Sequence, residues 1–160
     1  GLSVSDGGIT AGVVARPPQS AYDTLVLSAG SDDGVAVGME VFGAGNVPIG
    51  VISSVDEDFS RATMFSAPGM SIYGWVGKAS IPITISGAGG GVISSSAPRS
   101  AGISVGDIVY APGPGMLPVG SVVRVDSDPT SPSVTLRIMP TINLFSVAWV
   151  SIRDTRISLP

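Results

Sequence analysis

The stretch TLVLSAGSDDGVAVGMEVFGAGNVPIGVISSV, residues 24–55, decides the fold of this chain. Runs rich in Val, Ile, Leu and Thr, such as residues 24–27 and 51–55, alternate in it with segments rich in Gly, Asp and Pro. Runs of about four to eight such residues between turn residues are typical of β-strands. The stretch therefore predicts short strands joined by turns.

The same pattern continues along the chain, with further runs at residues 81–85, 121–125, 134–138 and 148–152. The 22 Gly and 13 Pro among 160 residues argue against long helices, because Gly costs backbone entropy and Pro lacks an N–H donor. We expect an all-β protein of two small tandem β-barrels or sandwiches, built from short antiparallel strands with little helix. Closed or nearly closed sheets would leave few strand edges exposed.

Composition excludes several classes of function. With 44% hydrophobic and 12% charged residues, the chain can bury a core and does not have the composition of a disordered protein. A net charge of −4 with scattered basic residues argues against nucleic-acid binding. The chain has no His and no Cys, which excludes an imidazole base, a thiol nucleophile, a zinc thiolate site and disulfides. We expect no catalytic residue, no cofactor and no metal.

No segment has the length and character of a membrane span. The longest apolar stretch, residues 138–152, is interrupted by Pro140, Asn143 and Ser146 and is shorter than the run of about 20 apolar residues that crosses a bilayer. No signal peptide is recognisable. We expect any membrane anchor to lie outside this segment.

An internal repeat links two parts of the chain. The sequence GVAVGMEV at residues 34–41 matches GISVGDIV at residues 102–109. Further on, PIGV at 48–51 matches PVGS at 118–121, and a Val-Asp pair follows in both copies. The spacing between the copies slips slightly from the first match to the second, and this slip falls in Gly- and Pro-rich turns, where insertions are tolerated. The shared order of these motifs indicates a common structural unit.

The repeat leads to an expected division of the chain into two β-barrel subdomains. We place the first at residues 13–86, with strands that it shares with the second, and the second at residues 87–153. The joint is expected at the GAGGG run of residues 87–91, where glycines permit a flexible hairpin or interdomain turn.

Two motifs resemble those of a known family. The sequence TLVLSAGSDDGVAVGMEV at residues 24–41, preceded by VVARPP at 13–18, resembles the pattern TLxIxxGSxDGVxxGMxV of the rod-shape-determining MreC family. The later segment 105–120 resembles that family's VGDxVxTSGxGxxFPxGxPVG, and residues 134–152 resemble its closing strands. The chain departs from the pattern at Ala29, where the family usually has Lys, and at 111–113, where Ala-Pro-Gly replaces Thr-Ser-Gly. Residues 72–102 match no motif.

The resemblance implies an elongasome scaffold with two β-barrel subdomains on the periplasmic side of the bacterial inner membrane. Such proteins are membrane-anchored, determine cell shape and support peptidoglycan synthesis. Their implied partners are the elongation transpeptidase, which is a class B penicillin-binding protein, then MreD, through it MreB, and other copies of themselves. We therefore expect a non-enzymatic function based on protein–protein interaction.

The residues themselves leave two alternatives. One is a β-barrel module of another periplasmic adaptor or envelope assembly. The other is a small hydrolase that uses a Ser-Lys dyad built on Lys78, the single Lys, with Ser80 nearby, or the aspartates at 32–33 and 56–58. Adjacent acidic residues on a turn more often cap backbone N–H groups and stay solvated, and a lone Lys in a hairpin is usually exposed.

Large apolar side chains are the expected partner-binding residues, because aromatic residues bury a large area at little cost in rotamer entropy. Strand alternation sends part of each cluster outward. The candidates are Met70, Ile72, Tyr73, Trp75, Met116, Leu117, Phe145 and Trp149.

Overall fold

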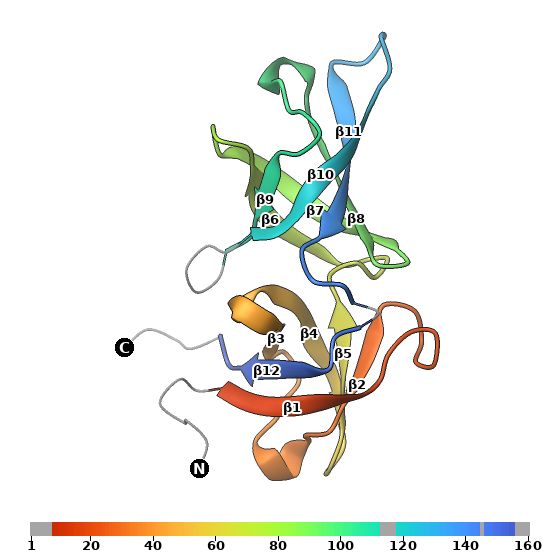
Figure 1. Cartoon of the computed structure of the whole chain (residues 1–160), viewed down its shortest axis with the longest axis vertical. Helices are drawn as coiled ribbons and strands as arrows, with labels where there is room; N and C mark the ends of the chain where they lie inside the picture. Colours follow the sequence, from red (N-terminus) through yellow and green to blue (C-terminus); the bar gives the residue numbers. More distant parts are fainter. Residues whose placement is uncertain (1–7, 113–117, 145, 156–160) are drawn as a thin grey trace. The chain divides into compact units, whose positions relative to one another are not determined.

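The computed structural model describes residues 8–112, 118–144 and 146–155 (Figure 1). The described chain is almost entirely β-structure, as expected, with three single 3₁₀ turns: η2 (Ser31–Asp33), η3 (Ala44–Asn46) and η4 (Arg99–Ala101). Its strands are β1 (Gly8–Ala15), β2 (Thr24–Leu27), β3 (Glu40–Phe42), β4 (Pro48–Val55), β5 (Ser60–Met64), β6 (Ser71–Val76), β7 (Ile81–Gly89), β8 (Val92–Pro98), β9 (Ile108–Tyr110), β10 (Pro118–Ser127), β11 (Ser133–Pro140) and β12 (Trp149–Arg153).

Six strands close into a first barrel, which we call barrel 1. Their order around the barrel is β1-β12-β3-β4-β5-β2, and every neighbouring pair is antiparallel. Because successive side chains of a strand face opposite sides, every second residue enters the core. Leu25 and Leu27 of β2 and Ile52 of β4 fill this core and are at most 1% exposed.

The remaining six strands close into barrel 2, in the order β10-β11-β8-β7-β6-β9. Strand β11 shows the strictest alternation: Val134, Leu136 and Ile138 are buried, and the residues between them are exposed. These side chains pack with Val76, Val109 and other apolar residues in one hydrophobic cluster. Both barrels confirm the expected architecture of two units of short antiparallel strands.

The boundary expected at residue 87 has to be corrected. Strands β6 and β7, which end at Val76 and Gly89, belong to barrel 2, and β12 returns from the far end of the chain to barrel 1. The physical reason is that barrel 1 lacks a sixth strand until β12 lies between β1 and β3, where it buries Ile152. The Gly-rich run at 87–91 is the β7–β8 hairpin turn inside barrel 2, with Gly89, Gly90 and Gly91 at positive φ.

The repeat seen in the sequence is a repeat in strand pairing. In barrel 1, Phe42 of β3 pairs with Pro48 and Val41 pairs with Gly50. In barrel 2, the same pairs recur between β9 and β10, as Tyr110 with Pro118 and Val109 with Gly120. Strands β4 and β10 also carry a register shift at matching positions, after Ile52 and after Val122. The expectation of a shared structural unit is confirmed.

The match extends to the whole strand order if β12 is the counterpart of β6. Strand β6 lies between β7 and β9 in barrel 2, and β12 lies between β1 and β3 in barrel 1. Barrel 2 takes its six strands, β6 to β11, from one uninterrupted segment of the chain. In barrel 1, strands β1 to β5 take the places of β7 to β11, and the place of β6 is taken by β12 from the end of the chain.

Candidate interaction surfaces

Strand β6 places two of the predicted aromatic residues on the outside of barrel 2. Tyr73 is 76% exposed, and Trp75, two residues further and therefore on the same face, is half-buried. Met70, just before the strand, is also half-buried. Ile72 points the opposite way and packs, partly buried, against the core cluster of barrel 2, so it does not share the outward face of Tyr73 and Trp75.

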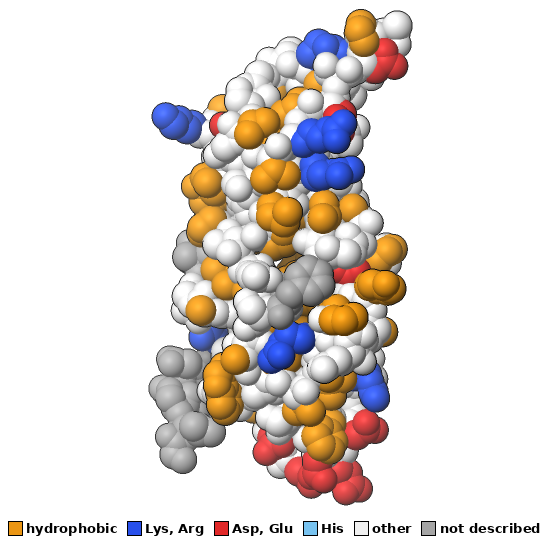
Figure 2. All heavy atoms as spheres, turned by 45° about the vertical axis from the view of Figure 1, so that its right-hand side comes forward, with side chains coloured by type: hydrophobic (Ala, Val, Ile, Leu, Met, Phe, Trp, Pro, Cys, Tyr) orange, Lys and Arg blue, Asp and Glu red, His pale blue; other side chains and the backbone are white. Residues whose placement is uncertain are grey.

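Neighbouring strands extend this apolar surface. Trp75 lies opposite Pro82 of β7 on one side and opposite Tyr110 of β9 on the other. Ile108, two residues from Tyr110, is 39% exposed. We call Tyr73, Trp75, Pro82, Ile108 and Tyr110 the outer band. Hydrophobic side chains are spread over the surface of the molecule seen in Figure 2.

Sequence reasoning missed three members of the outer band. Ile108 and Tyr110 flank the fully buried Val109 in a strand of three residues, so the alternation that places them outside is too short to notice. The sequence places Pro82 in a strand but assigns it no face. The repeat aligns Tyr110 with Phe42 in a strand of the other copy, but Phe42 is fully buried, so the repeat gives no signal that Tyr110 is on the surface.

The predicted Trp149 lies on the outside of barrel 1 and is 67% exposed. It pairs with Gly12 of β1, and two atoms of its ring lie 3.6 and 3.8 Å from the point where a Cβ on Gly12 would be. The indole ring therefore packs over Gly12, within van der Waals distance of that point. Aromatic side chains often cover a glycine on a neighbouring strand in this way.

Tyr73 and Trp149 occupy equivalent places in the two barrels. Trp75 pairs with Tyr110, and Ser151 pairs with Phe42, the repeat counterpart of Tyr110. The aromatic residues lie two positions before Trp75 and Ser151, on the same outward face. Each barrel thus presents an exposed aromatic side chain at the same point of its strand order. The remaining candidates, Met116, Leu117 and Phe145, lie outside the described residues.

The acidic residues considered for catalysis lie in turns. The N–H groups of Ser31 and Asp32 donate hydrogen bonds to the carbonyl oxygens of Asp56 and Glu57, at 2.8 and 3.0 Å, so η2 is held against the β4–β5 turn. Asp33 accepts a hydrogen bond from the N–H of Gly30 at 3.0 Å. Acidic side chains gather on the surface at one end of barrel 1 (Figure 2). These contacts are those of a capped, solvated turn.

The described residues contain no group of three or more His, Cys, Asp or Glu placed to hold a metal ion. Lys78, proposed for the Ser-Lys alternative, is exposed in the turn between β6 and β7. A lysine that serves as a general base is usually desolvated in an apolar pocket, and the exposed position of Lys78 provides none.

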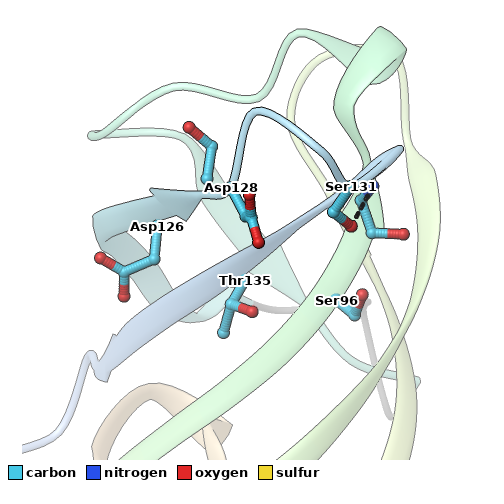
Figure 3. Close-up of a pocket in the computed structure, with 7 residues that line it drawn as sticks. Ser96, Asp126, Asp128, Ser131 and Thr135 are labelled. Atoms are coloured by element: carbon cyan, nitrogen blue, oxygen red, sulfur yellow. Dashed lines mark hydrogen bonds between the residues drawn. The ribbon is translucent and has the colours of Figure 1, made fainter.

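A polar hollow of about 490 Å³ lies beside the β10–β11 hairpin (Figure 3). Its two carboxylates already have partners. The Nε of Arg124 donates to Asp126 at 2.6 Å, and the N–H and hydroxyl of Thr130 donate to Asp128 at 3.0 and 2.8 Å. The hydrogen bonds from Thr130 lower the pKa of Asp128. A carboxylate with a lowered pKa is a poor general base near neutral pH. The hollow is lined by Ser96, Asp126, Ser127, Asp128, Ser131, Ser133 and Thr135.

Comparison with known proteins agrees with this arrangement of strands. A family model described as the barrel core of the rod shape-determining protein MreC matches residues 13–154. This chain belongs to the MreC family. The match includes both copies of the internal repeat and the closing strand β12, so the family's core spans both barrels.

Solved MreC structures have the same fold at low sequence identity. The MreC structure from Pseudomonas aeruginosa is 21% identical with a TM-score of 0.82, and the alignment covers 91% of this chain and 97% of that one. MreC from Listeria monocytogenes is 19% identical with a TM-score of 0.76, over 96% of this chain and 78% of that one. A complex of penicillin-binding protein PBP2 and MreC from Helicobacter pylori matches at 12% identity and a TM-score of 0.60, over 91% and 98%.

A direct search of curated protein sequences finds no match. Among the described residues, none of the helices has the length and apolar character needed to cross a membrane.

Proposed function

We propose that this chain is a non-enzymatic scaffold of the bacterial cell-elongation machinery, which acts in cell shape and peptidoglycan synthesis by binding the elongation transpeptidase. Family membership supports a role in rod shape. The Helicobacter pylori structure supports the choice of partner, because it is a complex of an MreC protein with a penicillin-binding protein. The same proposal places the chain on the periplasmic side of the inner membrane, as a solved MreC structure is of the major periplasmic domain.

The observation that carries the proposal is the outer band of barrel 2. Tyr73 exposes most of its ring to solvent, and Trp75 stands between Pro82 and Tyr110 on adjacent strands. Aromatic residues of this kind dominate the binding energy of protein interfaces. Met70 lies directly before β6, and Trp149 is the counterpart of Tyr73 on barrel 1. A surface with few charged groups also loses little hydration energy when it meets a partner.

We further propose that the chain self-associates and reaches MreB through MreD, as the family resemblance implies. Met116, Leu117 and Phe145 remain proposed contacts from the sequence.

The test is binding of the purified periplasmic part of the organism's own class B penicillin-binding protein, measured by calorimetry. Tyr73→Ala and Trp75→Ala should each weaken binding about 10-fold or more, as expected for interface anchors. Trp149→Ala reports whether barrel 1 takes part in the same interface.

Val105→Ala is the matched control, because Val105 is 63% exposed on barrel 2 but lies outside the outer band. It should change the affinity less than about threefold, the usual range for an exposed residue outside an interface. Unchanged binding of both aromatic variants, or no binding by the unmodified chain, would count against the proposal.

A further inference from the structure

Barrel 1 is closed by a strand that does not follow its other strands along the chain. Strands β1 to β5 end at Met64, the chain then forms all of barrel 2, and it returns to barrel 1 at Asn143. In sequence, barrel 2 therefore separates β12 from the rest of its own barrel. The strands of barrel 2, in contrast, follow one another directly from β6 to β11.

The place of β12 in barrel 1 is a specific slot between β1 and β3. Five residue pairs join β12 to β1, and three join it to β3. Val150 and Ile152 fill the core at 3% and 0% exposure. An empty slot would leave these core neighbours and two strand edges open to water, so a strand must occupy it.

The slot is formed by the edges of β1 and β3, and the β12 strand that fits it has the same sequence in every copy of the protein. The β12 strand of a second copy would bury the same Ile152 and pair with the same β1 and β3. It would also bring the same guanidinium of Arg153, which lies 5.1 Å from the ring centre of Phe42 and donates to Asn46 at 2.7 Å. Exchange of an identical element between copies is a low-cost route to oligomers.

The end of β12 is also its least well satisfied part. The Nε of Arg153 is buried without a hydrogen-bond partner among the described residues. Glu40 of β3 lies opposite Arg153 in the strand ladder and is half-buried. The buried Nε without a partner costs free energy in the closed form and so lowers the net cost of releasing the strand.

We propose that β12 is an exchangeable strand, and that the slot between β1 and β3 accepts β12 from a second copy, which joins copies of the chain into oligomers. The proposal rests on the self-association in the proposed function and gives it a structural mechanism. Barrel 1 of each copy would then be completed by the last strand of a neighbouring copy. Barrel 2 would keep its own six strands.

The test uses the absence of Cys from the sequence. Thr10 of β1 pairs directly with Ser151 of β12, so a Thr10→Cys/Ser151→Cys variant places two sulfur atoms within reach of a disulfide. The matched control is Ser71→Cys/Ser86→Cys, a direct pair between β6 and β7 of the uninterrupted barrel 2. Oligomeric and monomeric fractions are separated, oxidised and compared on non-reducing denaturing gels.

Exchange predicts that the oligomeric fraction of the Thr10/Ser151 variant is cross-linked at twice the chain mass or more, while the control stays at the mass of one chain. Cross-links confined to single chains in that fraction would overturn exchange and leave self-association standing. The absence of any oligomeric fraction would overturn both.

If the Thr10→Cys/Ser151→Cys variant does not fold, two single-cysteine variants test the same exchange. Copies with Thr10→Cys alone and copies with Ser151→Cys alone are given different tags, unfolded together, refolded and oxidised. Exchange predicts a disulfide between the two kinds of copy in the oligomeric fraction. Failure of that link, while oligomers form, would again overturn the proposal.

Discussion

Two inward-facing serines differ in how their buried hydroxyls are satisfied. Ser60 of β5 is 1% exposed in barrel 1, and its hydroxyl has no hydrogen-bond partner among the described residues. Ser95 of β8 is 6% exposed in barrel 2 and donates to the carbonyl oxygen of Thr84 at 2.7 Å. A buried polar group without a partner costs free energy, whereas a paired one contributes a little.

We predict opposite effects of removing these two hydroxyls. Ser60→Ala should leave stability unchanged or raise it by up to about 1 kcal/mol, because an unpaired hydroxyl is lost from the core. Ser95→Ala should lower stability by about 1 kcal/mol, because the Thr84 carbonyl loses its donor. Urea unfolding curves of both variants provide the measurement. A clear loss of stability in Ser60→Ala would show that its hydroxyl has a partner.

At the scale of elements, each barrel contains the same bulged hairpin. The second strand of this hairpin has a glycine where it lies close to the backbone of the next strand. A Cβ added to Gly50 of β4 would lie 2.5 Å from the carbonyl oxygen of Thr63 on β5. The same atom on Gly120 of β10 would lie 2.5 Å from the carbonyl oxygen of Met139 on β11. Both contacts are with backbone, which cannot turn away as a side chain would. The Pro-x-Gly step of the repeat is therefore a packing requirement.

Alanine at either glycine should destabilise the barrel that contains it. Gly50→Ala and Gly120→Ala are each expected to lower stability by about 1–3 kcal/mol, the usual cost of overpacking. The control is Gly45→Asn: Gly45 has a φ of 72° and nothing within 4 Å of an added Cβ. Asn tolerates this conformation, so the control should shift stability by less than about 0.5 kcal/mol. Thermal unfolding followed by circular dichroism compares the three variants, and equal melting temperatures would contradict the argument.

On the scale of the whole molecule, the two barrels have separate cores and different continuity along the chain. Barrel 2 is one uninterrupted segment, Phe65–Ile142, while barrel 1 combines the two ends of the chain. Ile152 of β12 is fully buried in barrel 1, and Ile138 of β11 is fully buried in the core cluster of barrel 2. Loss of a core side chain should therefore affect one barrel at a time.

Ile152→Ala and Ile138→Ala test this separation. Each removes a fully buried aliphatic side chain, a change that costs about 2–5 kcal/mol. Hydrogen exchange should show lost protection of β1 and β3 in the first variant and of β10 and β8 in the second. Protection lost in both barrels by either single variant would show that the barrels unfold as one unit.

The candidate surface could be predicted in part. Strand alternation and the favourable energetics of aromatic contacts were enough to select Tyr73 and Trp149, which are largely exposed. Ile72 adjoins Tyr73 and was selected with it, and the same alternation turns Ile72 to the opposite face, where it packs partly buried against the core cluster. Tyr110 was missed because its surroundings depend on a pairing with Trp75 across a loop, which a linear sequence does not display.

The sequence by itself determined the class of structure, the repeated hairpin and the family, since these depend on local alternation, turn residues and short motifs. Tertiary structure alone decided where barrel 1 ends. Local patterns specify that β12 is a strand but carry no information about which edges it will join. That choice follows from the gap between β1 and β3, where β12 pairs with both edges and buries Ile152.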